Sequence, residues 1–450
     1  MIIQKSKDKN IPINYFEKKY ETMDYQELKT LQIARLKETL KAVFIKNDFY
    51  KNKLSEAGIK CINDIDNIKN IDDIKNLPFT SKIDLVSNYP FGIFSRPLRD
   101  MARIHASSGT TGKPIIAGYT KRDVKVWSQL MARVLCAAGL GKNDIGQNAY
   151  GYGLFTGGLG FHYGAEALGM TIIPMSTGFT ERQFTMMEDI GATALFCTPS
   201  YALFLGEEIN KFIKDTSKIK LKKGIFGAEP WSNEFRQNIE NLLNIDAYDI
   251  YGLSELIGPG VAFECVYKNG LHINEDNFFP EIINPKTGEA LKEGEPGELV
   301  LTSLNRQAMP LIRFRTKDIT SLYKDKCKCG RSFVRMRKIK GRTDDMIILK
   351  GVNIFPSQIE SIIFRYDYLE PAYLIELYTD NFLDKMNVII EPKQEIFNMG
   401  ESKIDEIIKE ISHKIYELIG IRSKVTAVPP KTLERSQGKS KRIRDLRKKI

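Results

Sequence analysis

Residues 107–114 read SSGTTGKP, and this segment governs how the rest of the chain is interpreted. Small hydroxyl residues and two glycines follow the apolar and basic run 101–106, which predicts a loop leaving a strand. Its backbone N–H groups and hydroxyls could hold phosphate oxygens, and Lys113 would add a mobile positive charge. A Walker A loop would need Gly at position 107 and Ser or Thr in place of Pro114, which has no N–H to donate. The segment is therefore either a phosphate loop of another kind or a flexible surface linker.

Further motifs follow this loop in order along the chain. They are GAEP at 227–230, DIYGLSE at 249–255, RTKD at 315–318, GRTDD at 341–345 and Gly-Lys at 438–439. With SSGTTGKP they resemble the motif series of the adenylate-forming enzymes, which include acyl-CoA synthetases, luciferases and peptide-synthetase adenylation domains. The stretches at 77–94 and 150–164 resemble the phenylacetate–CoA ligases in particular. The resemblance extends from residue 20 to the end of the chain.

The bulk composition agrees with a cytoplasmic enzyme. The chain has 450 residues, of which 42% are apolar, enough for two or more domains with buried cores. The first ten residues, MIIQKSKDKN, hold no apolar signal-peptide core, and no run of about 18 apolar residues could span a bilayer. Six cysteines are too few for a disulfide framework. We expect no membrane partner.

The net charge of +11 raises the question of nucleic-acid binding. Residues 431–450 hold nine Lys or Arg and two acidic residues, so this tail alone carries +7. The tail has no interleaved aromatics and no recognisable nucleic-acid motif. We therefore interpret it as a solvated face or a docking surface for a phosphate-rich small molecule, and expect no nucleic-acid partner.

The pattern of apolar runs predicts an α/β fold. Short runs at 170–175, 194–197 and 224–226 are separated by helical stretches such as 180–190 and 201–212, which is the rhythm of parallel β-α-β units. We expect a large N-terminal α/β domain over 1–341, with mixed and parallel sheets and helices on their faces. A small, mobile α+β domain is expected over 342–450, with a helix starting at Pro356.

Other segments give local predictions. Residues 20–57 indicate one or two amphipathic helices, 121–140 a helix that stops at Gly139 or Gly141, and 288–301 β-hairpins. GAEP and DIYGLSE are each expected directly after a strand. Ligands collect at the carboxyl ends of parallel strands, so both motifs are expected to border one cleft.

The resemblance to adenylate-forming enzymes implies which residues bind ATP. Tyr251 would stack on adenine, Asp318 would accept from both ribose hydroxyls, and Glu255 would bind Mg²⁺ through a carboxylate oxygen. The family usually has Thr-Gly-Asp where this chain has Thr316-Lys317-Asp318, which leaves the loop conformation open. The implied cofactor-binding residues are Ser107, Ser108, Gly109, Gly112, Gly227, Ala228, Glu229, Pro230, Tyr251, Gly252, Asp318, Arg342 and Gly351.

The same resemblance implies the catalytic residues. Attack of a carboxylate on the α-phosphate of ATP brings negative charges together, so a metal and cationic donors must neutralise the transition state. Asp344 would be the hinge of the small domain, and Gly351 would line the pantetheine tunnel. Lys441 competes with Lys439 for the role of C-terminal lysine. The implied catalytic set is Lys439, Lys113, Thr110, Thr111 and Glu255.

The stretch 150–164 alternates aromatics with six glycines. Glycines let a ligand or another backbone approach closely, so the stretch is either an aromatic pocket for a planar acyl group or aromatic packing at a glycine-rich crossing. The candidate pocket residues are Tyr150, Tyr152, Phe155, Gly158 and Phe161.

Four residues form a separate candidate metal site. Cys265, His272, Cys327 and Cys329 supply three thiolates and an imidazole, a tetrahedral set that suits structural Zn²⁺ and leaves no open position for catalysis. The alternative is two unrelated hairpins with buried free cysteines.

The resemblance as a whole predicts ATP-dependent ligation of an arylacetic acid, by preference phenylacetate, to coenzyme A through an acyl-adenylate. Required small molecules would be the carboxylic acid, ATP, Mg²⁺ and coenzyme A, and a homodimer is the expected assembly. Two alternatives stay open. One is an adenylating enzyme of the same fold that acts on another aromatic acid or passes its acyl or nucleotidyl group to an acceptor other than CoA. The other is a non-catalytic nucleotide-binding or nucleic-acid-binding protein.

Overall fold

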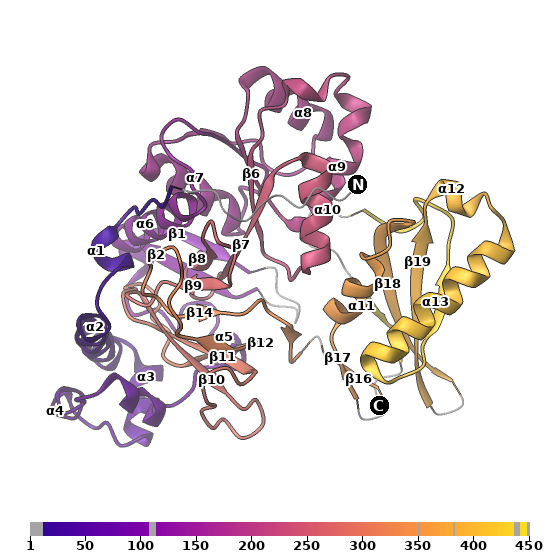
Figure 1. Cartoon of the computed structure of the whole chain (residues 1–450). Helices are drawn as coiled ribbons and strands as arrows, with labels where there is room; N and C mark the ends of the chain where they lie inside the picture. The colour runs from indigo at the N-terminus through magenta and orange to yellow at the C-terminus, as the bar shows by residue number, and fades with distance from the viewer. Residues whose placement is uncertain are drawn as a thin grey trace.

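The computed structural model describes residues 12–107, 114–344, 346–349, 352–380, 383–435 and 442–447. Figure 1 shows two bodies, a large N-terminal domain and a small C-terminal domain coloured orange to yellow. This arrangement confirms the predicted fold class.

A nine-stranded mixed sheet forms the centre of the large domain. Its strands are β3 (Ile145–Asn148), β4 (Thr171–Ile173), β5 (Ala194–Cys197), β6 (Lys223–Gly227), β7 (Asp246–Leu253), β8 (Gly258–Glu264), β9 (Leu271–Ile273), β13 (Leu322–Tyr323) and β14 (Arg335–Met336). Their order is β13-β14-β9-β8-β7-β6-β5-β3-β4. The pairs from β4 to β7 are parallel and those from β7 to β13 are antiparallel. The predicted β-α-β rhythm thus corresponds to the parallel half of the sheet.

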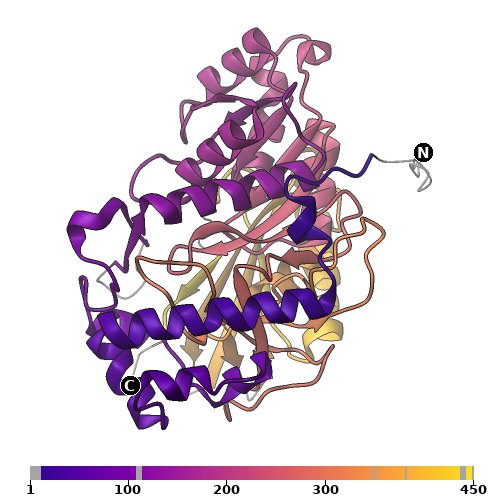
Figure 2. The same cartoon turned by 90° about the vertical axis from the view of Figure 1, so that its left-hand side faces the viewer.

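The large domain contains several helices, and the one at 121–137 begins and ends where the sequence signals predict. They are α1 (Lys18–Glu21), α2 (Tyr25–Lys46), α3 (Asp48–Glu56), α4 (Ile62–Asp66), α5 (Lys82–Ser87), α6 (Lys121–Ala137), α7 (Gly157–Leu168), α8 (Thr180–Ile190), α9 (Pro199–Phe212) and α10 (Asn233–Leu243). Thr120 caps α6 by accepting from the Asp123 N–H, while the Asp123 carboxylate accepts from the Thr120 N–H. Gly139, with φ +79°, follows its end, as predicted. Figure 2 shows the long helices α2 and α6 on the outer face of the domain.

A second sheet and a hairpin complete the large domain. The second sheet is antiparallel and contains β10 (Phe278–Ile283), β11 (Gly297–Ser303), β12 (Phe314–Thr320) and β15 (Gly341–Arg342). The chain between β10 and β11 turns back as the predicted hairpin. Strands β1 (Met101–Ala106) and β2 (Ile116–Thr120) pair antiparallel on either side of 107–114.

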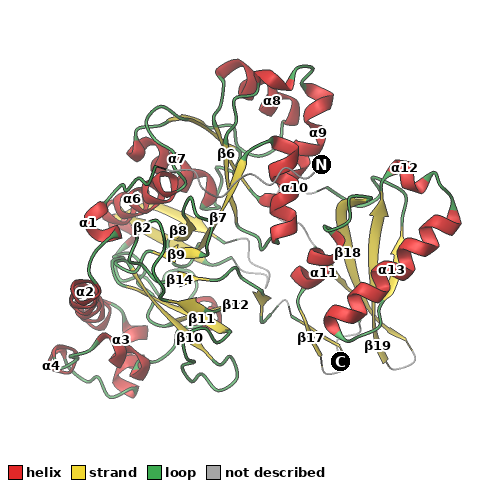
Figure 3. Ribbon diagram, in the orientation of Figure 1, coloured by secondary structure: helices red, strands yellow, loops and turns green. Residues whose placement is uncertain are grey.

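The small domain is a helix-covered sheet (Figure 3). Its elements are β16 (Ile347–Leu349), β17 (Val352–Ile354), α11 (Pro356–Ile363), β18 (Leu369–Asp380), β19 (Leu383–Pro392), α12 (Gln394–Phe397), α13 (Glu401–Ile419), β20 (Lys424–Ala427) and β21 (Ile443–Asp445). The helix from Pro356 is present as predicted. Helix α13 buries an isoleucine every fourth residue, at 407, 411, 415 and 419, which is the apolar stripe of an amphipathic helix.

One local prediction is wrong. DIYGLSE does not follow a strand, because its first five residues form the carboxyl-terminal part of β7 itself. Strand β7 pairs on one side with β6 and on the other with β8, so backbone pairing continues through Tyr251 to Leu253. Only Ser254 and Glu255 lie in the turn that follows.

Candidate active site

The GAEP motif lies at the carboxyl end of β6 and is held from two sides. The Tyr150 hydroxyl accepts from the Gly227 N–H at 3.0 Å and lies 3.3 Å from the Gly227 carbonyl oxygen. A Cβ on Gly227 would meet the Ile250 carbonyl at 2.4 Å, so only glycine fits between the strands. The Glu229 carboxylate accepts from the Ser200 N–H, at the start of α9, at 2.7 Å. The motif is thus a fixed backbone ledge beside β7.

A chain of polar contacts links three strands beside this ledge. The Tyr251 hydroxyl on β7 donates to Asp318 Oδ2 on β12 at 2.6 Å. Arg342 on β15 donates to Asp318 Oδ1 at 3.2 Å and to both oxygens of Asp344 at 2.8 and 2.9 Å. The structure therefore brings together four residues predicted to bind nucleotide or form the hinge, although 93 positions separate the first from the last.

Burial shapes the electrostatics of this set. Burial raises the pKa of Asp318 to about 6, against the opposing effect of the Arg342 charge and the Tyr251 hydrogen bond. Burial, together with the Asp318 charge, raises the pKa of Tyr251 well above its ordinary value. Tyr251 therefore stays a neutral donor, and the Asp318 carboxylate is its acceptor near neutral pH.

Lys317 stands where the family usually has glycine, and its backbone shows the conformation of this loop. It adopts φ +69°, in the left-handed region that glycine occupies without strain. Its N–H donates to Glu298 Oε1 at 3.2 Å, which helps hold the bulge between β11 and β12. The loop therefore keeps the conformation that glycine favours, at a cost of about 1 kcal/mol.

Glu255 lies in the turn between β7 and β8 and is largely buried. Its carbonyl oxygen accepts from Arg306 Nη1 at 2.5 Å, which fixes the turn. A Cβ on Gly252 would meet the Gly258 carbonyl at 2.0 Å, so the close crossing of the two strands requires glycine there. A buried, hard carboxylate oxygen at this position fits a Mg²⁺ ligand.

The phosphate-loop motif is closed at its base. Ser107 N–H donates to the Ile115 carbonyl at 2.9 Å, and the Ile115 N–H donates to the Ser107 hydroxyl at 3.2 Å. These bonds hold the two ends of the loop together. The remaining candidates of the loop and the small domain lie outside the described residues: Ser108, Gly109, Thr110, Thr111, Gly112, Lys113, Gly351, Lys439 and Lys441.

The aromatic stretch divides into buried and partly exposed rings. Phe161 is fully buried and stacks between Tyr150, at 5.1 Å, and Phe196, at 4.8 Å. Tyr152 and Phe155 are only partly buried. The packing of Tyr150 and Phe161 agrees with the core alternative for those two rings, whereas Tyr152 and Phe155 can still face a ligand.

The glycines of this stretch let helices pack closely. A Cβ on Gly164 would meet Met131 Cβ at 2.3 Å, and one on Gly160 would meet the Trp127 ring at 2.7 Å. Gly158, in the candidate pocket, would meet the Gly151 carbonyl at 2.4 Å. At these positions the glycines serve the contact of α7 with α6 and with the preceding loop.

The four candidate metal ligands meet in one buried cluster. Ligand atoms of Cys265, His272, Cys327 and Cys329 all lie within 4.8 Å of one another. Cys265 Sγ and Cys327 Sγ are 3.7 Å apart, and Cys329 Sγ is 3.4 Å from His272 Nε2. A tetrahedron with Zn–S bonds of about 2.3 Å has S···S edges of about 3.8 Å, so the cluster has the dimensions of a Zn²⁺ site.

The surroundings of this cluster also suit a metal. His272 Nδ1 lies 3.4 Å from the Phe333 carbonyl oxygen, a partner that would leave Nε2 free to ligate. Hydrogen bonding from Cys265, with a further contribution from His272, lowers the pKa of the Cys327 and Cys329 thiols. Thiolates crowded around an imidazole are stabilised by a cation.

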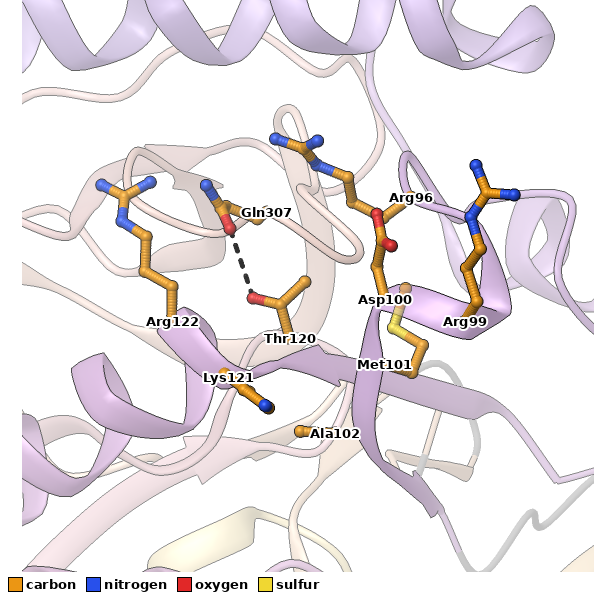
Figure 4. Close-up of a pocket in the computed structure, with 9 residues that line it drawn as sticks. All are labelled: Arg96, Arg99, Asp100, Met101, Ala102, Thr120, Lys121, Arg122 and Gln307. Carbon is orange, nitrogen blue, oxygen red and sulfur yellow. Dashed lines mark hydrogen bonds between the residues drawn. The ribbon is translucent and has the colours of Figure 1, made fainter.

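A separate hollow of about 370 Å³ lies where β1 begins and β2 ends, at the end of the hairpin opposite residues 107–114. Figure 4 shows Arg96, Arg99 and Arg122 extending to the same side, with Thr120 and Gln307 hydrogen-bonded between them at 3.3 Å. The hollow is not part of the site built around Tyr251.

Sequence patterns gave no sign of two contacts that hold site residues in place. The hydroxyl of Tyr150 at GAEP and the guanidinium of Arg306 at Glu255 are separated from their partners by 77 and 51 positions. The local signals of this close packing are Gly227 at the end of β6 and Gly252 near the end of β7. Among the described helices, none has the length and hydropathy that crossing a membrane requires.

Comparisons with known proteins agree with this geometry. The AMP-binding enzyme family matches residues 38–306, and the AMP-binding enzyme C-terminal domain matches 351–447. A phenylacetate-coenzyme A ligase of Thermus thermophilus is 43% identical over 96% of this chain and 100% of its own length. One of Pseudomonas putida is 45% identical over 95% of this chain and 96% of its own length.

Solved structures of a 2-hydroxyisobutyryl-CoA ligase share the whole fold. Its postadenylation state in complex with 2-HIB-AMP has a TM-score of 0.88 at 25% identity and covers 95% of this chain and 91% of its own. Its thioesterification state with 2-HIB-AMP and CoA has a TM-score of 0.69 at 26% identity, with coverage of 95% and 92%.

The fold, the nucleotide-site geometry and these matches define the class of adenylate-forming, AMP-binding enzymes. Within that class the chain belongs to the phenylacetate–CoA ligase family. It is an AMP-forming acid–CoA ligase that acts through an acyl-adenylate.

Proposed function

We propose that this enzyme ligates an arylacetic acid, by preference phenylacetate, to coenzyme A. The observation that carries the use of ATP in this proposal is the joined set of Tyr251, Asp318 and Arg342 beside the GAEP ledge. Near full-length similarity to four phenylacetate-coenzyme A ligases, at 43–45% identity, supports the choice of acid.

In the first half-reaction the substrate carboxylate attacks the α-phosphorus of ATP, and the bond to pyrophosphate breaks. Tyr251 and Asp318 hold the adenosine, with the Asp318 carboxylate accepting from the ribose hydroxyls. Lys113, the hydroxyls of Thr110 and Thr111, and Lys439 stabilise the developing charge. Mg²⁺, held by Glu255, would supply further charge neutralisation.

In the second half-reaction the thiol of coenzyme A attacks the acyl carbon, the bond to AMP breaks, and the thiol proton is lost. We propose that the small domain, residues 342–450, rotates about Asp344 against residues 1–341 between the two steps, with Gly351 lining the path of the pantetheine. The TM-scores of 0.88 and 0.69 support this view, because one relative adopts both arrangements and this chain is more similar to the postadenylation one.

For the acid pocket we propose Tyr152 and Phe155, with Gly158 allowing close approach. Both rings are partly exposed. The Tyr152 hydroxyl accepts from Asn148 Nδ2 at 2.7 Å, which fixes the ring near the carboxyl end of β3. Tyr150 and Phe161 belong to the buried core against which Phe155 packs.

We further propose that Cys265, His272, Cys327 and Cys329 hold one structural Zn²⁺. The cluster clamps the β8–β9 turn to the 327–330 loop, and Tyr15 Oη, which donates to the Cys329 carbonyl at 2.6 Å, adds the N-terminal segment. Four protein ligands leave no position for substrate, so the metal would act on stability alone. A homodimer and a cytoplasmic location complete the proposal and rest on family resemblance.

The test is pyrophosphate release with ATP and Mg²⁺ across a panel of carboxylic acids, each with and without CoA. Release that depends on an arylacetic acid, with acyl-CoA formed only when CoA is present, is the expected result. Pyrophosphate release without CoA consumption would indicate another acceptor. No release with any acid would overturn the proposal.

A further inference from the structure

Arg435 of the small domain lies among three carboxylates, one of which belongs to the large domain. Its Nη2 is 2.8 Å from Glu391 Oε2 and 3.6 Å from Glu370 Oε2, both in the small domain. Its Nε is 3.8 Å from Oε2 of Glu207, on α9 of the large domain. The guanidinium therefore bridges the two domains.

The small domain holds Arg435 in place. Glu391, on β19, is fully buried, and its carboxylate accepts from the N–H groups of Lys431 and Leu433 as well as from Arg435. Lys431 adopts φ +64°, so the chain turns sharply before it reaches Arg435. Arg435 is thus fixed relative to β19, and the contact that depends on domain position is the one with Glu207.

Glu207 depends on this contact. Its Oε1 is buried without a hydrogen-bond partner among the described residues. Burial raises the pKa of Glu207 to about 7, and the Arg435 charge is the first influence that opposes the rise. Three carboxylates share the one guanidinium of Arg435. Because Arg435 stays with the small domain, Glu207 loses its stabilising cation when the domains separate.

We propose that Arg435 is a positioning residue for the adenylation step and that its ion pair with Glu207 docks the small domain in the adenylation arrangement. The inference rests on the proposed function, because it assigns Lys439 to that step. Lys439 follows Arg435 by four residues, so the two Cα atoms are at most about 14 Å apart. Fixing Arg435 against α9 therefore limits where the lysine can be.

The pair joins the two domains in the arrangement of this structure. It joins α9 to the segment after β20, and the same interface contains the Ser232 N–H, which donates to Glu360 Oε1 at 3.0 Å, and the rings of Phe235 and Phe364 at 4.8 Å. The postadenylation relative has the higher TM-score, so these contacts belong to that arrangement. On the proposal, a rotation of the small domain to the thioester-forming state would break the Glu207 contact, and Arg435 should be dispensable for thioester formation.

The test measures the two half-reactions separately in Glu207→Gln, Arg435→Gln and the double variant. Adenylation is followed by acid-dependent exchange of pyrophosphate into ATP, and thioester formation by CoA acylation from supplied acyl-adenylate. Exchange is expected to fall about three- to tenfold in each single variant and no further in the double, while thioester formation is unchanged or faster. Glu208→Gln is the matched control, since Glu208 neighbours Glu207 but pairs with Lys211 within α9 at 3.1 Å.

A second measurement needs no catalysis. Hydrogen exchange at the Ser232 amide, which is protected by its bond to Glu360 across the interface, is expected to speed up in Glu207→Gln and not in Glu208→Gln. Equal loss of both half-reactions, multiplicative effects in the double variant, or an unchanged Ser232 amide would overturn the inference. A wild-type enzyme inactive with every acid would instead count against the proposed function. Exchange at the Ser232 amide would still decide whether the ion pair of Glu207 and Arg435 docks the small domain.

Discussion

The hydroxyl of Tyr251 donates a 2.6 Å hydrogen bond to Oδ2 of Asp318, and this bond ties the central sheet to the second sheet at the nucleotide site. Because Arg342 holds Oδ1 of the same carboxylate, both oxygens of Asp318 are oriented before any nucleotide arrives. An acceptor already in place loses little freedom when it binds the ribose.

Tyr251→Phe removes the hydroxyl and keeps the ring that would stack on adenine. We expect kcat/KM for ATP to fall about tenfold, because a hydrogen bond to a charged group contributes about 1.5 kcal/mol. The rate is measured by pyrophosphate exchange at several ATP concentrations. Tyr251→Ala, which also removes the ring, should lose more, and equal losses in the two variants would argue against stacking.

The raised pKa of Asp318, about 6, predicts a pH dependence of ATP use. Below this pH the carboxyl is protonated and cannot accept from both ribose hydroxyls, so kcat/KM for ATP should fall as pH decreases through about 6 and level off above it. The effect on stability has the opposite sign, since a raised carboxyl pKa stabilises the fold at low pH and that contribution is lost as pH rises through about 6.

The control for this pH dependence is Asp318→Asn. The variant should use ATP poorly at every pH and should lack the inflection near pH 6. If the inflection persists in Asp318→Asn, another group is responsible for it.

Lys317→Gly should stabilise the enzyme. Lys317 has φ +69°, and glycine removes the strain of that conformation while keeping the N–H that bonds Glu298. The net gain is at most about 0.5 kcal/mol, because the extra freedom that glycine gives the unfolded chain offsets much of the relieved strain. Thermal unfolding should shift upward by at most about 1 °C. Lys317→Ala keeps the strain and should show no gain, so stabilisation by alanine as well would assign the effect to the lysine side chain.

The zinc proposal predicts one equivalent of zinc per chain and a metal-dependent melting temperature. Zinc content is measured by elemental analysis, and unfolding is followed with and without a strong chelator. Cys327→Ser and Cys329→Ser should lose the metal and melt at lower temperature, whereas Cys61→Ser, at an exposed cysteine outside the cluster, should retain it. Metal-free protein with wild-type stability would contradict the proposal.

The sequence predicts helices and strands better than it predicts contacts between residues far apart in the chain. Helices α6 and α11 follow their caps and their Gly or Pro signals because those interactions are local. The pair of Tyr251 and Asp318 spans 67 positions and that of Glu207 and Arg435 spans 228, and no local pattern encodes such distances. Resemblance to the family's motif series predicted that Tyr251 and Asp318 share one site. Glu207 and Arg435 belong to no motif, so only the structure shows that they are paired.

The aromatic stretch offers a final test, since two phenylalanines six positions apart lie in different surroundings. Phe161 stacks between Tyr150 and Phe196 in the core, so Phe161→Leu should lower the free energy of unfolding by about 1–2 kcal/mol and leave KM for the acid nearly unchanged. Phe155 is partly exposed, so Phe155→Leu should raise KM for arylacetic acids with little effect on stability. Denaturant unfolding and acid-dependent pyrophosphate exchange separate the two effects. If Phe155→Leu leaves KM for arylacetic acids unchanged, Phe155 does not line the acid pocket.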